Sequence, residues 1–304
     1  MATLQLDPAT LNAMRQLLQG KNRKWATPGD MAQHLDPDTI QTPALQLIDQ
    51  TLIDTTNTTD GRAIITLPPQ EGKSQRVSRR YPLWTLTHNP NTRIAIVSYS
   101  HAVARRWGRT IRDDITTHPD LGLTIRPDLS AQHEWQLAEA QGGVYTTGIG
   151  GSLTGRPVDL LIIDDPIKDR EQADSTIYRN RVWDWWTDVA STRLAPGAPV
   201  ILILTRWHQD DLAGRLLNAP DGHRWKLLNI PAQAETNNDP LRRKPGQWLQ
   251  SSRRRTTKQW EAIKQQAGSR TFNSLYQGHP SPPGGTIFNR DHWIIDPHPT
   301  WQAD

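Results

Sequence analysis

Cysteine is absent from the 304 residues of this chain. Its absence excludes disulfide bonds and thiolate metal sites, and it fits a protein of a reducing, intracellular compartment. Long hydrophobic runs are also missing, because no stretch approaches the ~20 apolar residues that a membrane-spanning helix needs. The first 20 residues lack the basic start and apolar block of a secretory signal, and the chain has no internal repeat. We therefore expect a cytosolic protein without membrane contact.

Length and charge narrow the class of protein further. A chain of 304 residues exceeds the usual size of one domain, so we expect one large α/β domain with an appendage. The net charge of +4 and the pI near 9.5 fit a polyanionic partner, although the excess is modest. Positive charge is concentrated in two short runs near the C-terminus, Arg242-Arg243-Lys244 and Arg253-Arg254-Arg255.

The stretch Leu-Pro-Pro-Gln-Glu-Gly-Lys-Ser at residues 67–74 is the centre of the functional prediction. It follows an apolar run that is typical of a buried strand and precedes a helical pattern over residues 75–84, which is the layout of a phosphate-binding loop. In such a loop an ammonium, here Lys73, neutralises the outer phosphates, and a hydroxyl, here Ser74, holds Mg²⁺. Leu67 stands where the pattern expects glycine, so a Gly-Lys-Ser turn without function is the alternative. The predicted nucleotide contacts are Gln70, Glu71, Gly72, Lys73, Ser74 and Gln75.

A second pattern lies at residues 158–166, where an apolar run ends in Asp164-Asp165-Pro166. This is the form of a Walker B strand in a parallel sheet whose two faces are both covered. Asp164 would hold Mg²⁺ through water, and Asp165 would polarise the attacking water. The alternative is a core strand that ends in a solvated Asp-Asp turn.

Other polar residues follow strands in positions where ligands bind. Thr205 ends the apolar run at residues 199–204, where it would sense the γ-phosphate unless it is only a strand-ending threonine. Arg156 is the only cation of the glycine-rich loop at residues 148–156, and it is either a charge-stabilising arginine finger or a structural arginine. Upstream, Gln46 or Trp25 would contact adenine, although a surface glutamine and a core tryptophan are the ordinary interpretations.

The alternation of apolar runs and helical patterns predicts an α/β fold with a mainly parallel, doubly wound P-loop NTPase sheet. We expect a helical segment at residues 1–57, with helices over residues 8–18 and from Thr42-Pro43 onward. The ATPase core would span residues 58–235, with a hairpin through residues 141–143. A small linker or lid subdomain would occupy residues 236–304, with a short helix at 256–266.

Taken together, these motifs resemble the large terminase subunits of tailed bacteriophages, whose N-terminal half is the ATPase that drives viral DNA into the capsid. The motifs occur in the order of that family across residues 60–290. They are Pro68-Pro69-x-x-Gly72-Lys73-Ser74, Ser98-Tyr99-Ser100, Gly150-Gly151-x-Leu153-Thr154-Gly155-Arg156, Asp164-Asp165-Pro166-Ile167-Lys168, Thr205-Arg206-Trp207-His208 and Leu275-Tyr276-Gln277.

The resemblance implies an ATPase of the additional-strand class that uses ATP and Mg²⁺ to move double-stranded DNA. It implies a homo-oligomeric ring, a pentamer at the capsid portal in the host cytoplasm, with the portal protein and the small terminase subunit as partners. By motif position, Asp164 would be the Walker B acid, Asp165 would replace the more common catalytic Glu, and Thr205 would belong to the coupling motif. Gln70-Glu71 replaces the family's usual basic residue, which shifts the expected arginine finger to Arg156, acting on a neighbour's nucleotide.

The family also carries a C-terminal nuclease, and this chain stops after the region that matches residues 288–293. Asp291, Asp296 and Asp304 do not form a two-metal constellation, so we expect no nuclease activity. Two other functions remain open. One is a helicase-like ATPase, which shares the loop and the acidic strand but would need a second motor core. The other is a nucleotide-binding assembly module with little hydrolysis.

Overall fold

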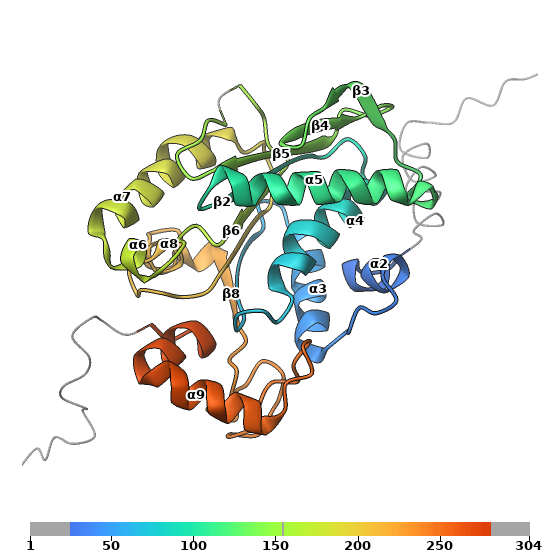
Figure 1. The fold of residues 1–304 in the computed structure, drawn as a ribbon. Coiled ribbons are helices and arrows are strands. Elements are labelled where there is room, and N and C mark those ends of the chain that lie inside the picture. The colour runs from blue at the N-terminus through green and yellow to red at the C-terminus, as the bar shows by residue number, and fades with distance from the viewer. Residues whose placement is uncertain (1–24, 154, 281–304) are drawn as a thin grey trace, which may run out of the picture.

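A computed structural model describes residues 25–153 and 155–280. Strands and helices alternate along these residues, so the predicted mixed α/β fold is confirmed (Figure 1). The predicted helix over residues 8–18 lies outside the described part. The strands are β1 (Arg62–Thr66), β2 (Arg93–Ser98), β3 (Ile125–Ser130), β4 (Glu134–Leu137), β5 (Gly143–Gly148), β6 (Leu160–Asp164), β7 (Val200–Leu204) and β8 (Trp225–Asn229).

All eight strands belong to one sheet, in the order β3-β4-β5-β2-β6-β7-β1-β8. The strands from β5 to β8 in this order pair in parallel. At the other edge, β3 and β4 are antiparallel, and β4 forms the predicted hairpin with β5. The carboxyl ends of the parallel strands therefore meet at one edge of the sheet, and β1, which precedes the 67–74 loop, lies between β7 and β8.

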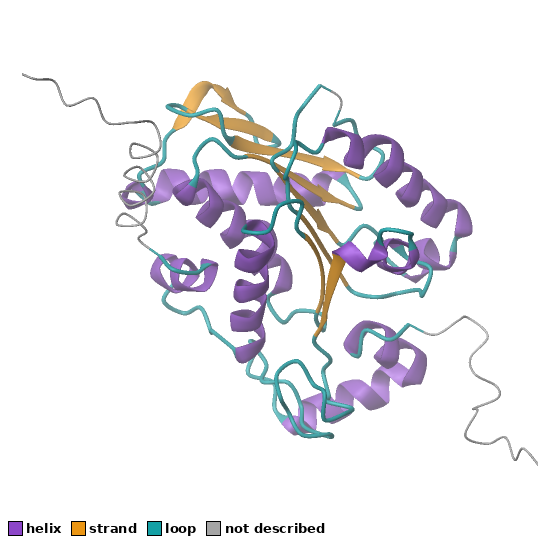
Figure 2. Cartoon of the chain, turned by 180° about the vertical axis from the view of Figure 1, so that it is seen from behind, coloured by secondary structure: helices purple, strands orange, loops and turns teal. Residues whose placement is uncertain are grey.

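Helices cover both faces of the sheet, and Figure 2 shows the strands between two groups of helices. On one face α2, α3, α4 and α5 pack on alternate strand residues such as Ile65, and on the other face α7 and α8 pack on residues such as Ile64. None of the helices in the described residues is long and apolar enough to span a bilayer. The helices are α2 (Pro28–Leu35), α3 (Pro43–Thr56), α4 (Tyr81–His88), α5 (His101–Thr117), α6 (Arg170–Asp174), α7 (Thr176–Asp184), α8 (Leu212–Asn218) and α9 (Thr257–Thr271).

Short π-helical and 3₁₀ segments extend several of these helices. The helix that follows the 67–74 loop begins with the π-helical segment η1 and continues as α4, whereas the sequence predicts one regular helix. The wider π turn is a recurrent feature of functional sites. The segments are η1 (Gln75–Arg80), η2 (Pro119–Leu121), η3 (Trp185–Ala190), η4 (Ser191–Arg193), η5 (Gly222–Arg224) and η6 (Phe272–Tyr276).

Capping side chains explain where several helices begin. Thr42 accepts a hydrogen bond from the backbone N–H of Leu45 and is followed by Pro43, so α3 starts where the sequence predicts. Asp211 caps α8 in the same way, by accepting from Gly214. Such bonds satisfy backbone donors that have no partner within the helix. Thr42 and Asp211 thus fix the first residues of α3 and α8.

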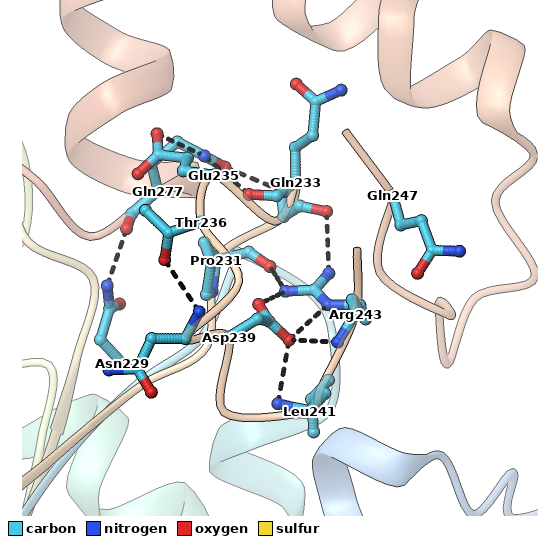
Figure 3. Close-up of polar contacts among 12 residues, drawn as sticks. Asn229, Pro231, Gln233, Glu235, Thr236, Asp239, Leu241, Arg243, Gln247 and Gln277 are labelled. Atoms are coloured by element: carbon cyan, nitrogen blue, oxygen red, sulfur yellow. Dashed lines mark hydrogen bonds and ion pairs between the residues drawn. The ribbon is translucent and has the colours of Figure 1, made fainter. Parts of the chain in front are cut away.

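The C-terminal residues 231–280 pack beside β8 and are held by side-chain contacts (Figure 3). Asp239 accepts hydrogen bonds from the guanidinium of Arg243 at 2.7 and 3.0 Å and from the backbone N–H of Leu241 at 2.9 Å. The Arg243 hydrogen bonds lower the pKa of Asp239 despite the opposing effect of burial. Gln277 joins the segment to the sheet, because its backbone carbonyl accepts from the side chain of Asn229 at 2.9 Å. These contacts hold residues 231–280 to one another and to the end of β8.

Candidate functional site

Four of the predicted site residues meet at the carboxyl edge of the parallel strands. Lys73, on the 67–74 loop, places its Nζ 3.2 Å from Oδ1 of Asp165, just after β6. The neighbouring Ser74 donates its hydroxyl to Oδ1 of Asp164 at 2.9 Å. Residues that are 90 positions or more apart in the chain thus converge because β1 and β6 both end at this edge, on either side of β7.

Asp164 is the most buried acid of the group, with only 3% of its surface exposed. Its second carboxylate oxygen accepts from the hydroxyl of Ser78 at 2.8 Å. Burial raises its pKa to about 6, and the adjacent charge of Asp165 adds to the rise, while Lys73 and the two serine hydroxyls act in the opposite direction. The site is thus short of positive charge near Asp164, which favours the binding of a cation there.

Replacing Asp164 with asparagine is expected to stabilise the metal-free protein at pH 8. An acid whose pKa is raised on folding from 3.8 to about 6 binds more protons in the folded state, so stability is lost as the pH rises through that window. Asparagine keeps the shape of the side chain and removes the cost of burying a charged carboxylate. We expect this to raise the free energy of unfolding by about 1–3 kcal/mol. Urea denaturation with EDTA measures the change.

The same substitution should have little effect on stability near pH 4, where the wild-type carboxyl is protonated in the folded protein. Added Mg²⁺ should stabilise the wild type more than the variant. An Asp164→Asn protein that is less stable than the wild type at pH 8 with EDTA would contradict this account of the buried acid.

Asp165 is held in an unusual backbone conformation beside Lys73. Its φ of 46° lies in the left-handed region, which non-glycine residues rarely adopt except in turns and functional sites. Its backbone N–H donates to Ile203 at 2.8 Å, and its carboxylate accepts from the backbone N–H of Thr205 at 2.9 Å. Thr205, the predicted coupling residue, therefore lies next to the predicted catalytic acid.

Two residues of the loop itself also have positive φ, Gln70 at 65° and Gly72 at 91°. They turn the backbone so that Gln70 is exposed while Glu71 is buried, with only 2% of its surface exposed. The Glu71 carboxylate does not line the cavity that Lys73 lines, and it accepts hydrogen bonds from the C-terminal residues Ser251 and Ser252 and from Arg255. The charge of the acidic residue in the loop is thus neutralised by Arg255.

A cavity of about 910 Å³ opens in front of these groups. It is lined by predicted site residues and also by two exposed arginines that the sequence interpretation did not single out, Arg106 on α5 and Arg253 in the C-terminal segment. Its volume and positive charge suit a polyphosphate. The predicted residues that line it are Gln70, Gly72, Lys73, Ser74, Gln75, Asp165 and Thr205.

Arg156 lies elsewhere in the same chain. Its guanidinium donates to the carboxylate of Glu134 at 3.0 and 3.2 Å and stacks 4.3 Å from the ring centre of Tyr145. The Glu134 hydrogen bonds raise the pKa of Arg156 further. Arg156 lines a separate cavity that also includes Arg93, the first residue of β2. Arg156 therefore lies toward the amino end of the parallel strands. Within one chain, the structure does not bring Arg156 to Lys73.

The two predicted adenine contacts are also apart from the large cavity. Gln46 is exposed on α3, and among the described cavities none is lined by it. Trp25 is buried and packs its ring 5.2 Å from that of His34, as the core alternative predicts. A smaller cavity of about 320 Å³ is lined in part by Thr39, Ile40 and the loop residue Gly72.

Comparison with known proteins gives the family. A model of the family described as "Terminase large subunit, T4likevirus-type, N-terminal" matches residues 64–293, most of the chain. The chain belongs to this family of terminase large subunits. Among curated protein sequences none matches significantly.

Two terminase structures have a similar fold. The HK97 bacteriophage large terminase is 16% identical with a TM-score of 0.54, over 79% of this chain and 51% of that one. A variant of the ATPase domain of the large terminase of Thermus phage P74-26 is 11% identical with a TM-score of 0.51, over 84% of this chain and 100% of that one. The chain thus spans about half the length of the HK97 terminase.

The terminase site contains residues that sequence reasoning missed. Ser78 follows Ser74 by four positions, a helical spacing that could have placed both hydroxyls beside Asp164. Arg106 and Arg253 gave no such signal, because each belongs to a run of arginines. In the described residues, no group of three or more histidine, cysteine or acidic side chains could hold a metal alone.

Proposed function

We propose that this chain is the ATP-hydrolysing motor domain of a DNA-packaging terminase, with the 67–74 loop as its P loop and β6 as its Walker B strand. The observation that carries the proposal is the meeting of Lys73, Ser74, Asp164 and Asp165 at one edge of the sheet, where Lys73, Ser74 and Asp165 line a cavity of triphosphate size. The mainly parallel sheet with helices on both faces supports a doubly wound P-loop fold of the additional-strand class.

Binding of the phosphates would follow from the charges and donors of the loop. The Lys73 ammonium, which pairs with Asp165, would turn to the outer phosphate oxygens and neutralise them. Backbone N–H groups from Gln70 to Gln75 would donate to the phosphates at the start of η1. The buried position of Glu71 removes the carboxylate that would otherwise oppose anion binding.

The residues present fit a Mg²⁺ ion. Ser74 and Asp164 offer a hydroxyl and a carboxylate oxygen 2.9 Å apart, which are ligands of the hard type that Mg²⁺ prefers. The hydroxyl of Ser98, level with Asp164 in the sheet, is buried and has no hydrogen-bond partner among the described residues. A bound Mg²⁺ would supply charge neutralisation between the outer phosphates.

Asp165 would accept the proton of the attacking water. Its carboxylate lies on the cavity and is only partly buried, so that it can reach a water beyond the last phosphate. The hydrogen bond from the backbone N–H of Thr205 would connect this acid to the residue after β7. A change at the last phosphate would thereby shift the loop that begins at Thr205. Gln46 lines neither cavity, but its neighbour Leu45 lines the smaller one, so we place the base there, beside Thr39 and Ile40.

On the scale of the whole assembly, the proposal is a ring, a pentamer at the portal in the host cytoplasm, that moves double-stranded DNA. The portal protein and the small terminase subunit are the proposed partners, and residues 58–235 are the proposed core, between a helical segment and a lid. Because Arg156 faces Glu134 in its own chain, a role as arginine finger would require it to leave that partner for a neighbour's nucleotide.

Release of phosphate from ATP tests this function. We expect hydrolysis that requires Mg²⁺ and rises when linear double-stranded DNA is added, with a DNA effect that weakens steeply with salt because the contacts are to phosphates. ATP binding without hydrolysis, with and without DNA, would favour the assembly module. Activity with DNA that separates its strands would favour the helicase-like alternative.

A further inference from the structure

The residues Ser251–Arg255 form a short segment, here called the arginine turn, that crosses from the C-terminal part of the chain to the 67–74 loop. Ser251 donates its hydroxyl to the Glu71 carboxylate at 2.9 Å, and the backbone N–H of Ser252 donates at 2.7 Å. Arg255 forms an ion pair with the same carboxylate and donates to the side chain of Gln70 at 3.3 Å. These contacts join the arginine turn to the loop.

The backbone of the turn separates its three arginines. Arg254 has a φ of 58° and donates its N–H to the carbonyl of Ser251 at 3.1 Å, which closes a tight turn. As a result Arg255 returns to Glu71, whereas Arg253 lines the large cavity together with Lys73 and Asp165. Arg254 is exposed and is not part of the lining of that cavity.

The arginine turn is also fixed from the other side. The Arg255 guanidinium lies 5.2 Å from the ring centre of Trp260, which is fully buried in the first half of α9 and donates to the carbonyl of Leu249 at 3.1 Å. An arginine that pairs with a buried carboxylate and stacks on a buried ring has little freedom. Arg253 is therefore carried on a rigid support, while its own side chain is exposed to the cavity.

Charge explains what Arg253 can do there. In the described residues no group accepts a hydrogen bond or an ion pair from its side chain. Arg253 lines the same cavity as Lys73, so the two side chains together offer two positive charges to a ligand. They suit a ligand whose negative charge is greater than the Lys73 ammonium alone can neutralise. A nucleoside triphosphate has that charge, and a diphosphate has less.

We propose that the arginine turn is a sensor for the triphosphate within the same chain: Arg253 binds the outer phosphate oxygens, and Glu71 positions it by holding Ser251, Ser252 and Arg255. This inference rests on the proposed function, because it needs a nucleotide at the 67–74 loop. Its consequence is that loss of the last phosphate releases the side chain of Arg253.

The experiment compares Arg253→Ala with Arg254→Ala, its neighbour in the same turn. Affinities for ADP and for a non-hydrolysable ATP analogue are measured by calorimetry, and turnover is measured by phosphate release with Mg²⁺. We expect Arg253→Ala to weaken the ATP analogue more than ADP and to lower kcat/KM by about 10–100-fold, the range for one lost hydrogen bond between charged groups. Arg254→Ala should stay within about twofold of the wild type, since alanine keeps the β-carbon and hence the backbone preference.

Two further variants separate the possible outcomes. If Lys73→Ala abolishes nucleotide binding or turnover while Arg253→Ala behaves like Arg254→Ala, the sensor is wrong and the proposed function stands. If neither the wild type nor Lys73→Ala binds nucleotide, the proposed function itself fails. Glu71→Gln should reduce the preference for the ATP analogue over ADP. A change in its melting temperature alone, with the preference intact, would make Glu71 a structural residue and overturn its positioning role.

Discussion

Replacing Lys73 with alanine should lower ATP turnover by about 10²–10³-fold or more, because one preorganised charge at the reacting phosphate is worth that much. Lys73 is 6% exposed and pairs with Asp165 at 3.2 Å, so its ammonium is already held where the outer phosphates would bind. The loss has two causes. The phosphates lose their cation, and the two adjacent acids keep their charges without a counter-ion. Phosphate release at saturating ATP and Mg²⁺ measures the effect.

Lys226→Ala is the matched control. Lys226 is exposed on β8, and its closest charged partner is Asp54 at 3.8 Å, so its loss should leave turnover unchanged. Circular dichroism and a melting curve show whether Lys73→Ala remains folded. A folded Lys73→Ala protein with turnover near that of the wild type would exclude the 67–74 loop from the mechanism.

Replacing Asp165 with asparagine should lower turnover by about 10²–10⁴-fold while ATP still binds, because the substitution removes a proton acceptor. Asparagine tolerates the positive φ at this position, and its amide oxygen can still accept from Lys73 and from the backbone N–H of Thr205. The geometry is thereby kept and only the base is lost. Single-turnover hydrolysis together with an ATP affinity measurement separates the two steps.

Asp60→Asn controls for the backbone effect of this substitution. Asp60 also has a positive φ, 54°, and accepts from the backbone N–H of Gly197. Asp165 follows the carboxyl end of the parallel strand β6, whereas Asp60 lies before the amino end of β1. Asparagine should be neutral there for both stability and turnover. An Asp165→Asn protein that hydrolyses ATP at the rate of the Asp60→Asn control would rule out Asp165 as the base.

Elements with a strong local signal were predictable from the sequence. The strand β2 is such an element, because Ile94 to Val97 form an apolar run that is buried on both faces of the sheet. By contrast, β3 was missed. Its sequence, Ile-Arg-Pro-Asp-Leu-Ser, contains a proline and exposed polar residues, and as the edge strand it is stabilised by pairing with β4 rather than by burial.

The same distinction holds for the site. Asp164 ends the buried strand β6, and Lys73 and Ser74 lie on the loop that follows the buried strand β1, so the parallel sheet was enough to predict that they meet. The position of Arg156 depends on a partner, Glu134, in an edge hairpin, and that of Arg253 depends on a turn held by Glu71. Neither contact leaves a periodic pattern in the sequence, since both join side chains across long separations.

The place of β1 in the sheet bears on how the chain acquires its structure during synthesis. Both neighbours of β1, the strands β7 and β8, are translated after almost everything else in the sheet. A nascent chain that has left the ribosome only up to α7 therefore lacks both strands with which β1 pairs. The phosphate loop would be assembled last, and intermediates that expose this apolar strand would be the ones most prone to aggregate.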